Sequence, residues 1–280
     1  MGNDVGGAFG REPSSPYVAY LQDSRKSLNA LIFLAPVLTV YHVGIWFMHT
    51  LDLRMANGAD VMLAEMLNLL YIMGLSALRT FAPEAGTPGG LAEGFLRTFS
   101  SFFALFLVVF ILLLKQHWEP GRWRFRPGVL FLMFLESALF ALPLFAIEWL
   151  IKYIGAFGAI PMMAGENPPG GGWVAGLVLS MGAGVYEEFL FRMLLMGLLF
   201  YLGKNLCRLK GWPLYCLALG AQALSFAGFH YLPWSNETWV LAVFVFRVVA
   251  GLYFGYLYQE RGLGIAAGAH VLYDIGAVTF

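Results

Sequence analysis

Long apolar stretches separated by short polar segments dominate the chain. They cover residues 28–50, 98–114, 129–151, 173–202, 213–232, 238–258 and 263–280. A helix needs about 20 predominantly apolar residues to cross the roughly 30 Å hydrocarbon core of a bilayer, and most of these stretches approach or exceed that length. We therefore predict an all-α fold, a polytopic bundle of transmembrane helices.

One further stretch, residues 60–80, is ambiguous because Asp60, Glu65 and Asn68 interrupt its Met and Leu residues. If it lies in the interface, the loops place eleven Lys and Arg residues on one side and four on the other; if it crosses, the split is six against nine. The positive-inside rule favours the first arrangement, with seven spans instead of eight and a cytoplasmic N-terminus. A bend or break in 173–202 would change this parity.

Composition supports a membrane location and excludes one class of partner. Hydrophobic residues make up 59% of the chain and charged residues 12%, against roughly 25% charged in soluble domains. The 17 basic and 17 acidic residues cancel, so we expect lipid and not nucleic acid as a partner. Residues 1–27 contain no apolar run, hence no signal peptide. We predict a polar cytoplasmic tail (1–27), N-terminal membrane helices and loops (28–172) and a membrane core (173–280), in a prokaryotic cytoplasmic membrane.

Ionisable residues gather inside the apolar stretches of the C-terminal half. Each charged group at mid-bilayer costs roughly 2.5–3.5 kcal/mol on insertion scales, so such groups mark candidate functional sites. They are Glu187, Glu188, Arg192, His230, Arg247, His270 and Asp274. We expect the active site among the last four helices. Glu136 and Glu148 lie in 129–151 without a motif around them, and we expect them to make contacts between helices.

Helical spacing separates the two adjacent carboxylates. Glu188 and Arg192 are four residues apart, about 40° around an α-helix, and can form an ion pair, whereas Glu187 lies about 140° from Arg192. We therefore predict that Arg192 holds Glu188 as a structural ion pair and that Glu187 is the carboxylate available as a base. A buried ion-pair network that also includes Arg247 is the competing interpretation.

The same spacing recurs in the next segments. His270 and Asp274 share one helix face, and Phe226 precedes His230 by four residues. Glu187, His230, His270 and Asp274 together are suited to activate a water and stabilise an oxyanion. This set of side chains favours peptide-bond hydrolysis.

Three motifs resemble those of the CAAX protease and bacteriocin-processing family, also called Abi, in order and spacing. That family carries Glu-Glu-x-x-x-Arg, Phe-x-x-x-His and His-x-x-x-Asn or Asp on successive membrane helices, and it includes the type II CAAX prenyl endopeptidases. The resemblance covers about residues 173–280. The matching segments are Glu187-Glu188-Phe-Leu-Phe-Arg192, Phe226-Ala-Gly-Phe-His230 and His270-Val-Leu-Tyr-Asp274.

The resemblance implies an intramembrane endopeptidase in which Glu187 and His230 activate water while His270 and Asp274 stabilise the oxyanion. Glu188, Arg192 and Phe226 would then have supporting roles. Asp274 stands where the motif usually has Asn, and an anionic carboxylate donates no hydrogen bond. It is therefore protonated, orients His270 or helps to hold a metal.

The resemblance requires no cofactor, and we assign no metal. If zinc takes part, Glu187, His230 and His270 are the expected ligands. The expected substrate is a membrane-associated protein or peptide, with CAAX-type processing and bacteriocin or other peptide processing both open. Two alternatives from other classes use the same residues: a proton-coupled transporter, and a non-catalytic immunity or scaffold protein of the membrane.

Overall fold

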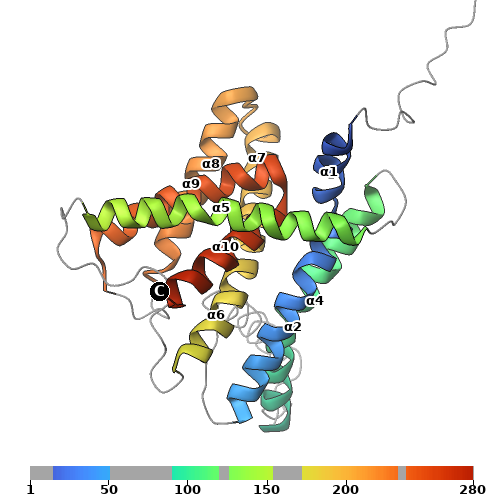
Figure 1. Ribbon diagram of the computed structural model, residues 1–280, viewed down its shortest axis with the longest axis vertical. Helices are drawn as coiled ribbons and strands as arrows, with labels where there is room; N and C mark the ends of the chain where they lie inside the picture. Colours follow the sequence, from blue (N-terminus) through green and yellow to red (C-terminus); the bar gives the residue numbers. More distant parts are fainter. Residues whose placement is uncertain (1–14, 51–89, 120–125, 154–171, 233–237, 280) are drawn as a thin grey trace, which may run out of the picture.

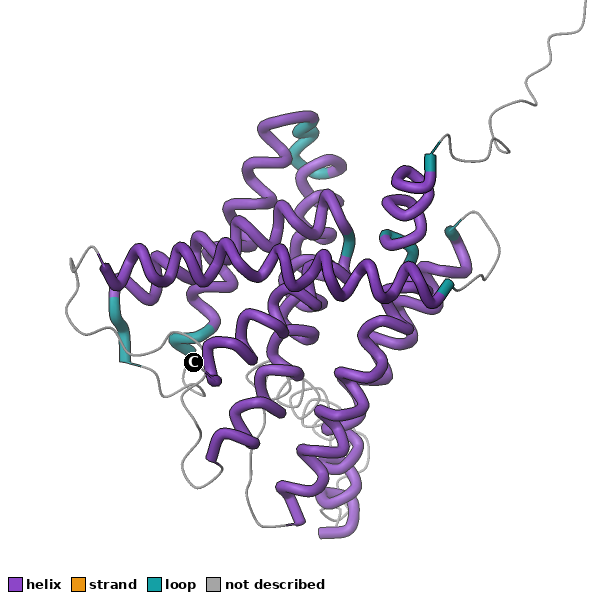
Figure 2. Tube along the Cα trace, in the orientation of Figure 1, coloured by secondary structure: helices purple, strands orange, loops and turns teal. Residues whose placement is uncertain are grey.

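The structure is a computed structural model that describes residues 15–50, 90–119, 126–153, 172–232 and 238–279. Every regular element in these ranges is a helix, and short turns join several of them (Figures 1 and 2). The predicted all-α fold is confirmed. The elements are α1 (Pro16–Ser24), α2 (Ser27–Thr50), α4 (Gly90–Trp118), α5 (Pro127–Tyr153), α6 (Gly172–Glu187), the π-helix η1 (Glu188–Leu195), α7 (Met196–Asn205), α8 (Gly211–Phe229), α9 (Leu241–Arg261) and α10 (Leu263–Thr279).

The seven predicted apolar stretches all coincide with helices. Five of these helices are long and apolar enough to cross a membrane: Ser27–Met48, Pro127–Ile151, Gly172–Asn205, Gly211–Phe229 and Leu241–Arg261. Phe102–Trp118 and Leu263–Thr279 are shorter apolar helices. The long stretch near 173–202 is one continuous span, interrupted by the eight-residue π-helical segment Glu188–Leu195. The ambiguous stretch 60–80 lies outside the described residues.

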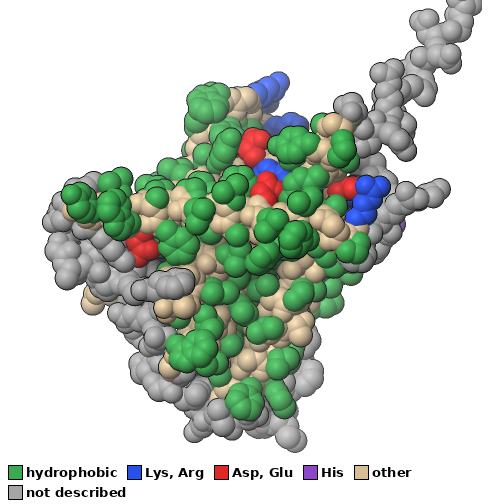
Figure 3. All heavy atoms as spheres, viewed as in Figure 1, with side chains coloured by type: hydrophobic (Ala, Val, Ile, Leu, Met, Phe, Trp, Pro, Cys, Tyr) green, Lys and Arg blue, Asp and Glu red, His purple; other side chains and the backbone are tan. Residues whose placement is uncertain are grey.

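The surface of the bundle is apolar, as expected of helices that face lipid. Hydrophobic side chains cover most of the face in Figure 3, and the charged groups on it gather toward its upper part. Large exposed side chains include Trp46, Phe106, Phe131 and Leu139, each more than half exposed. An apolar surface of this extent is too large for a water-soluble monomer and indicates contact with a membrane.

Polar contacts tie several helix ends together around α1, within the segment that we predicted as a polar tail. Ser15 caps α1 by accepting from the backbone N–H of Val18 at 3.3 Å, with Pro16 in the first turn. Ser27, at the start of α2, donates to Glu119 beyond α4 at 2.7 Å. The starts of α2 and α5 and the end of α4 therefore meet near α1 (Figure 1).

A second network anchors α1 to the core helices. Tyr20 and Arg261 both donate to the Glu136 carboxylate, Arg261 through its Nε at 2.5 Å. Arg261 also donates to the Ser24 hydroxyl at 3.0 Å. Glu136 thus makes a contact between helices, as expected from the sequence. Burial and the Glu136 carboxylate raise the pKa of Tyr20, so this phenol stays protonated and continues to donate.

Helix α10 lies between two hydrophobic clusters. One joins α2, α4, α6 and α10 around residues such as Leu34 and Val185, and the other joins α5, α9 and α10 around residues such as Met133 and Phe254. In Figure 1, α5 crosses over α10 and α6 approaches it from below. Close packing on both sides fixes the position of α10, which carries His270 and Asp274.

Candidate active site

The first motif lies where the helix changes from α to π. Glu187 is the last residue of α6 and Glu188 the first of η1, which continues through Arg192 to Leu195. A π-helix uses i→i+5 hydrogen bonds and is rare in proteins. The π-helical turns that do occur often lie at functional sites. The wider turn changes the angular relation between successive side chains, so the two carboxylates do not diverge as α-helical spacing predicts. Both are buried.

Antiparallel packing brings His230 to the level of Glu187. Helix α8 packs against α7 and η1, and a short loop joins Asn205 to Gly211. Eighteen residues forward from Gly211 reach Phe229, and eighteen back from Asn205 reach Glu187. The C-terminal end of α8 therefore lies at mid-height of the long span, with His230 as its cap residue.

Glu187 faces both imidazoles. Its Oε1 lies 3.8 Å from Nε2 of His230, and its Oε2 lies 3.9 Å from Nε2 of His270. The side chains are 8%, 19% and 7% exposed, respectively. These separations are too long for direct hydrogen bonds, but one water could contact both partners of either pair. The structure thus brings together residues from α6, α8 and α10 that are distant in the sequence.

The hydrogen bond at Nδ1 of His230 determines which ring nitrogen carries the hydrogen and which nitrogen His230 presents to the site as an acceptor. Nδ1 lies 2.9 Å from the backbone oxygen of Phe226, one helical turn earlier. A carbonyl oxygen only accepts, so Nδ1 carries the hydrogen and donates. In neutral His230 the bare Nε2 therefore faces Glu187 as an acceptor. This arrangement suits a base or a partner of a bound water.

Glu188 contacts His270 as well as Arg192. Its Oε1 lies 2.8 Å from Nδ1 of His270 and 3.1 Å from a guanidinium nitrogen of Arg192. Glu188 and Arg192 are fully buried. The carboxylate therefore orients the imidazole and balances the cation, whereas helical spacing alone had suggested only the ion pair. Glu187 and Glu188 thus approach different nitrogens of the same His270 ring.

Two phenylalanine rings enclose this charged group. The Arg192 guanidinium lies 4.3 Å from the ring centre of Phe226 and 5.5 Å from that of Phe254. None of its three nitrogens forms a hydrogen bond with a described residue, so the ion pair with Glu188 and the two rings stabilise the charge. Phe254 also stacks on His270, with ring centres 4.5 Å apart and planes inclined by 19°.

Sequence reasoning selected Phe226 but missed Phe254. Phe254 lies on α9 between Gly251 and Gly255, two small residues that approach α8 closely. A Cβ added at Gly251 would lie 2.9 Å from Cα of Ala223, and one added at Gly255 would lie 2.4 Å from the amide nitrogen of Gln222. This pair of glycines was the available signal, because small residues four apart mark the face of α9 that approaches another helix closely, and Phe254 lies next to that face.

Small residues and polar bonds also position α10. A Cβ added at Gly184 would lie 2.7 Å from the backbone nitrogen of Val271, so α6 and α10 touch directly next to the site. On the other side of α10, Tyr273 donates to Glu148 at 3.0 Å. Glu148 thus makes a contact between helices, as expected.

Asp274 lies beside His270 on the same helix face, with its Oδ2 3.5 Å from Nε2 of His270. Arg247 is buried above the ring of Tyr231, at 5.5 Å from the ring centre. Within the described ranges no group of three or more His, Cys, Asp or Glu side chains is arranged to hold a metal ion. The distances of 3.8 and 3.9 Å around Glu187 also exceed the roughly 3.3 Å between donor atoms that share a tetrahedral zinc with 2.0–2.1 Å bonds.

Comparison with known proteins agrees with the motifs. Residues 169–276 match the family described as type II CAAX prenyl endopeptidase, Rce1-like. Neither the curated proteins nor the solved structures include a match to the chain. The matched region contains all four residues expected to act in catalysis, and it includes most of α6 to α10. Residues 169–276, which include most of the predicted membrane core, thus match the Rce1-like family of type II CAAX prenyl endopeptidases, in agreement with the resemblance of the three motifs.

Proposed function

We propose that the chain is an intramembrane endopeptidase that hydrolyses a peptide bond of a membrane-associated protein or peptide by means of water activated by Glu187 and His230. The observation that carries this proposal is the position of the Glu187 carboxylate, whose two oxygens lie 3.8 and 3.9 Å from the Nε2 atoms of two imidazoles. A buried carboxylate that faces one buried and one partly exposed histidine is suited to act as a base on a water between them.

In the first step, a water between Glu187 and His230 attacks the carbonyl carbon of the scissile bond. The new bond joins the water oxygen to that carbon, and the carbonyl electron pair moves to its oxygen. Glu187 takes the proton, because its carboxylate accepts while His230 Nε2 accepts the second hydrogen of the same water. The product of this step is a tetrahedral intermediate with one negative charge.

His270 stabilises that charge when it is protonated. Its Nδ1–H donates to Glu188, and its Nε2–H then points toward Glu187 and the attacked carbonyl. The Glu188 carboxylate favours the imidazolium, which is the form able to donate to an oxyanion. Asp274, 3.5 Å from the same Nε2, also favours the positive charge.

The intermediate collapses when the bond between carbon and nitrogen breaks. The leaving nitrogen takes the proton from Glu187 and departs as an amine, and the carbonyl carbon becomes a carboxylic acid. Water has then been added across the peptide bond, and Glu187 is ready for another cycle. No step is assigned to a cofactor.

The family match favours a substrate processed close to its C-terminus, as in CAAX-type cleavage. The test uses purified full-length protein in lipid nanodiscs, with a farnesylated CAAX peptide, the same peptide without the lipid, and mass spectrometry of the products. We expect cleavage of at least one peptide and a loss of about 10²–10⁴-fold in rate in Glu187→Gln. Glu260→Gln, an exposed carboxylate at the end of α9, is the matched control and should cleave normally.

Three outcomes would contradict the proposal. Normal cleavage by Glu187→Gln would show that Glu187 is not the catalytic base. Unchanged biological activity in a Glu187→Ala, His230→Ala double variant would favour a non-catalytic role. A steady proton or solute flux in proteoliposomes that disappears in His270→Gln, without any peptide cleavage, would favour a transporter.

A further inference from the structure

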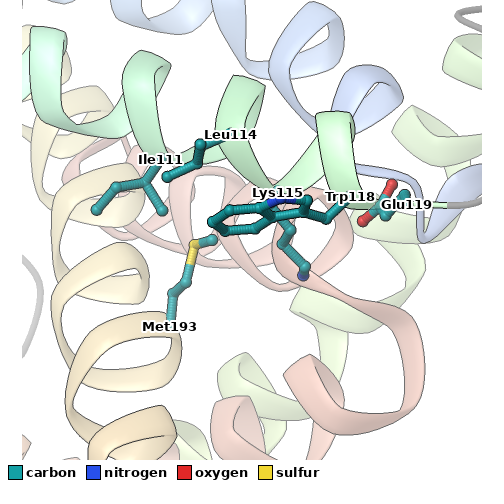
Figure 4. Close-up of a pocket in the computed structure, with 6 residues that line it drawn as sticks. All are labelled: Ile111, Leu114, Lys115, Trp118, Glu119 and Met193. Atoms are coloured by element: carbon teal, nitrogen blue, oxygen red, sulfur yellow. The ribbon is translucent and has the colours of Figure 1, made fainter.

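A groove outside the candidate active site opens between α4 and η1. Its volume is about 370 Å³, and Ile111, Leu114, Lys115, Trp118 and Glu119 of α4 line it opposite Met193 of η1. Figure 4 shows the Met193 side chain pointing toward Trp118 and the α4 side chains. The size is within the usual range for small-molecule sites. We refer to it as the α4–η1 groove.

The charged side chains at the edge of the groove differ in whether they already have a partner within the protein. Glu119 already accepts from the backbone N–H and the hydroxyl of Ser27, at 3.1 and 2.7 Å. Arg126, the next described cation after α4, lies 3.6 Å from Asp23. Lys115 is exposed and has no ion-pair partner among the described residues. Among the residues that the structure describes, Lys115 is therefore the available positive charge of the groove, beside an apolar floor.

Its place along α4 corresponds to the level of lipid headgroups. Lys115 and Trp118 belong to the last turn of the apolar helix Phe102–Trp118, next to the polar contacts around α1. Trp118 is 74% exposed, and indole rings prefer the interface between hydrocarbon and water. Ile111 lies one turn deeper in the apolar part of the helix. The polar edge and the apolar floor thus follow the order of a phospholipid, from headgroup to chain.

We propose that the α4–η1 groove binds one anionic phospholipid, with its phosphate at Lys115 and Trp118 and an acyl chain along Ile111, Leu114 and Met193. The apolar floor gives no preference among lipids, because every acyl chain is equally apolar. Selectivity comes from the cation, and a basic residue near a membrane surface contributes about 1 kcal/mol toward anionic lipid, which corresponds to a preference of about fivefold. This binding does not depend on peptide hydrolysis.

The experiment measures lipid contact at Trp118 by quenching of tryptophan fluorescence. Full-length protein is reconstituted with brominated phosphatidylglycerol or brominated phosphatidylcholine. The fluorescence quenching that belongs to Trp118 is the quenching in the unsubstituted protein minus that in Trp118→Phe. Trp212, 73% exposed at the start of α8 and no part of the groove, supplies a matched control through Trp212→Phe. Lys115→Met removes the charge and keeps the apolar stem, with Lys204→Met on α7 as its control.

We expect Trp118 to be quenched by the anionic lipid with an apparent affinity about fivefold higher than by the zwitterionic lipid. Trp212 should show a smaller preference, and Lys115→Met should remove the preference at Trp118 while Lys204→Met retains it. Equal quenching of Trp118 by both lipids would overturn the proposal, and so would an equal effect of the two lysine substitutions. Quenching by neither lipid would mean that protein covers the groove, which also overturns it.

Discussion

Removal of the Glu188 charge is expected to be more harmful to the fold than removal of the Arg192 charge. The Glu188 carboxylate lies 3.1 Å from the guanidinium, and both side chains are fully buried. Glu188→Gln removes the ion-pair partner of the Arg192 cation inside the bundle, which costs about 3–5 kcal/mol. Arg192→Met leaves a carboxylate that a protonated His270, at 2.8 Å, still neutralises. We expect that variant to lose less, about 1–3 kcal/mol.

The double variant Glu188→Gln, Arg192→Met separates the effect on stability from the effect on activity. With both charges gone, neither group is left buried and unpaired, so the free energy of unfolding should return to within about 2 kcal/mol of the unsubstituted protein. Peptide cleavage should not return, because a neutral Gln at position 188 no longer favours the His270 imidazolium.

Unfolding is followed by titration with sodium dodecyl sulfate in mixed micelles, and activity by peptide cleavage in nanodiscs. The partly exposed pair Asp23 and Lys26, at 2.6 Å, is the control. Neutralising either of its members should cost less than about 1 kcal/mol. Additive losses in the Glu188→Gln, Arg192→Met double variant would refute the reasoning, because they would show that the two charges do not interact. Recovered cleavage in that variant would refute the role of Glu188 in orienting His270.

Three further predictions concern packing and protonation. Gly184→Ala should lower the free energy of unfolding by about 1–3 kcal/mol and slow cleavage, because its Cβ would push α6 away from the α10 backbone, whereas Gly197→Ala, with open space around it, should be neutral. Phe254→Leu should lower kcat more than it raises KM, since it removes the ring that stacks on His270, and normal kinetics would contradict this role. Tyr20→Phe should destabilise by about 1 kcal/mol at pH 7–9. Because burial raises the pKa of Tyr20 in the folded state, the stability that this phenol provides should decrease as the pH rises above about 10, and a pH-independent difference to alkaline pH would contradict the assignment.

Periodicity and spacing in the sequence were sufficient for the helical class and for most of the residues at the site. Continuous apolar stretches of about 20 residues cross lipid as helices, because a helix satisfies every backbone group within its own segment. The pairs Glu188 and Arg192, and His270 and Asp274, were identifiable because residues four apart share one helix face. The close approach of α8 and α9 also left a trace, in Gly251 and Gly255.

The tertiary structure decided what each polar group contacts. No local pattern indicates that Glu188 reaches His270, 82 residues later, or that Phe254 stacks on that imidazole. The π-helical turn at Glu188 depends on long-range packing, because its hydrogen-bond geometry is unfavourable for an isolated helix. The level of His230 likewise follows from the antiparallel packing of α8 against the preceding span. Sequence determined which groups are buried in the membrane, because burial follows from local hydropathy, whereas their mutual distances result from helix packing and could come only from the fold.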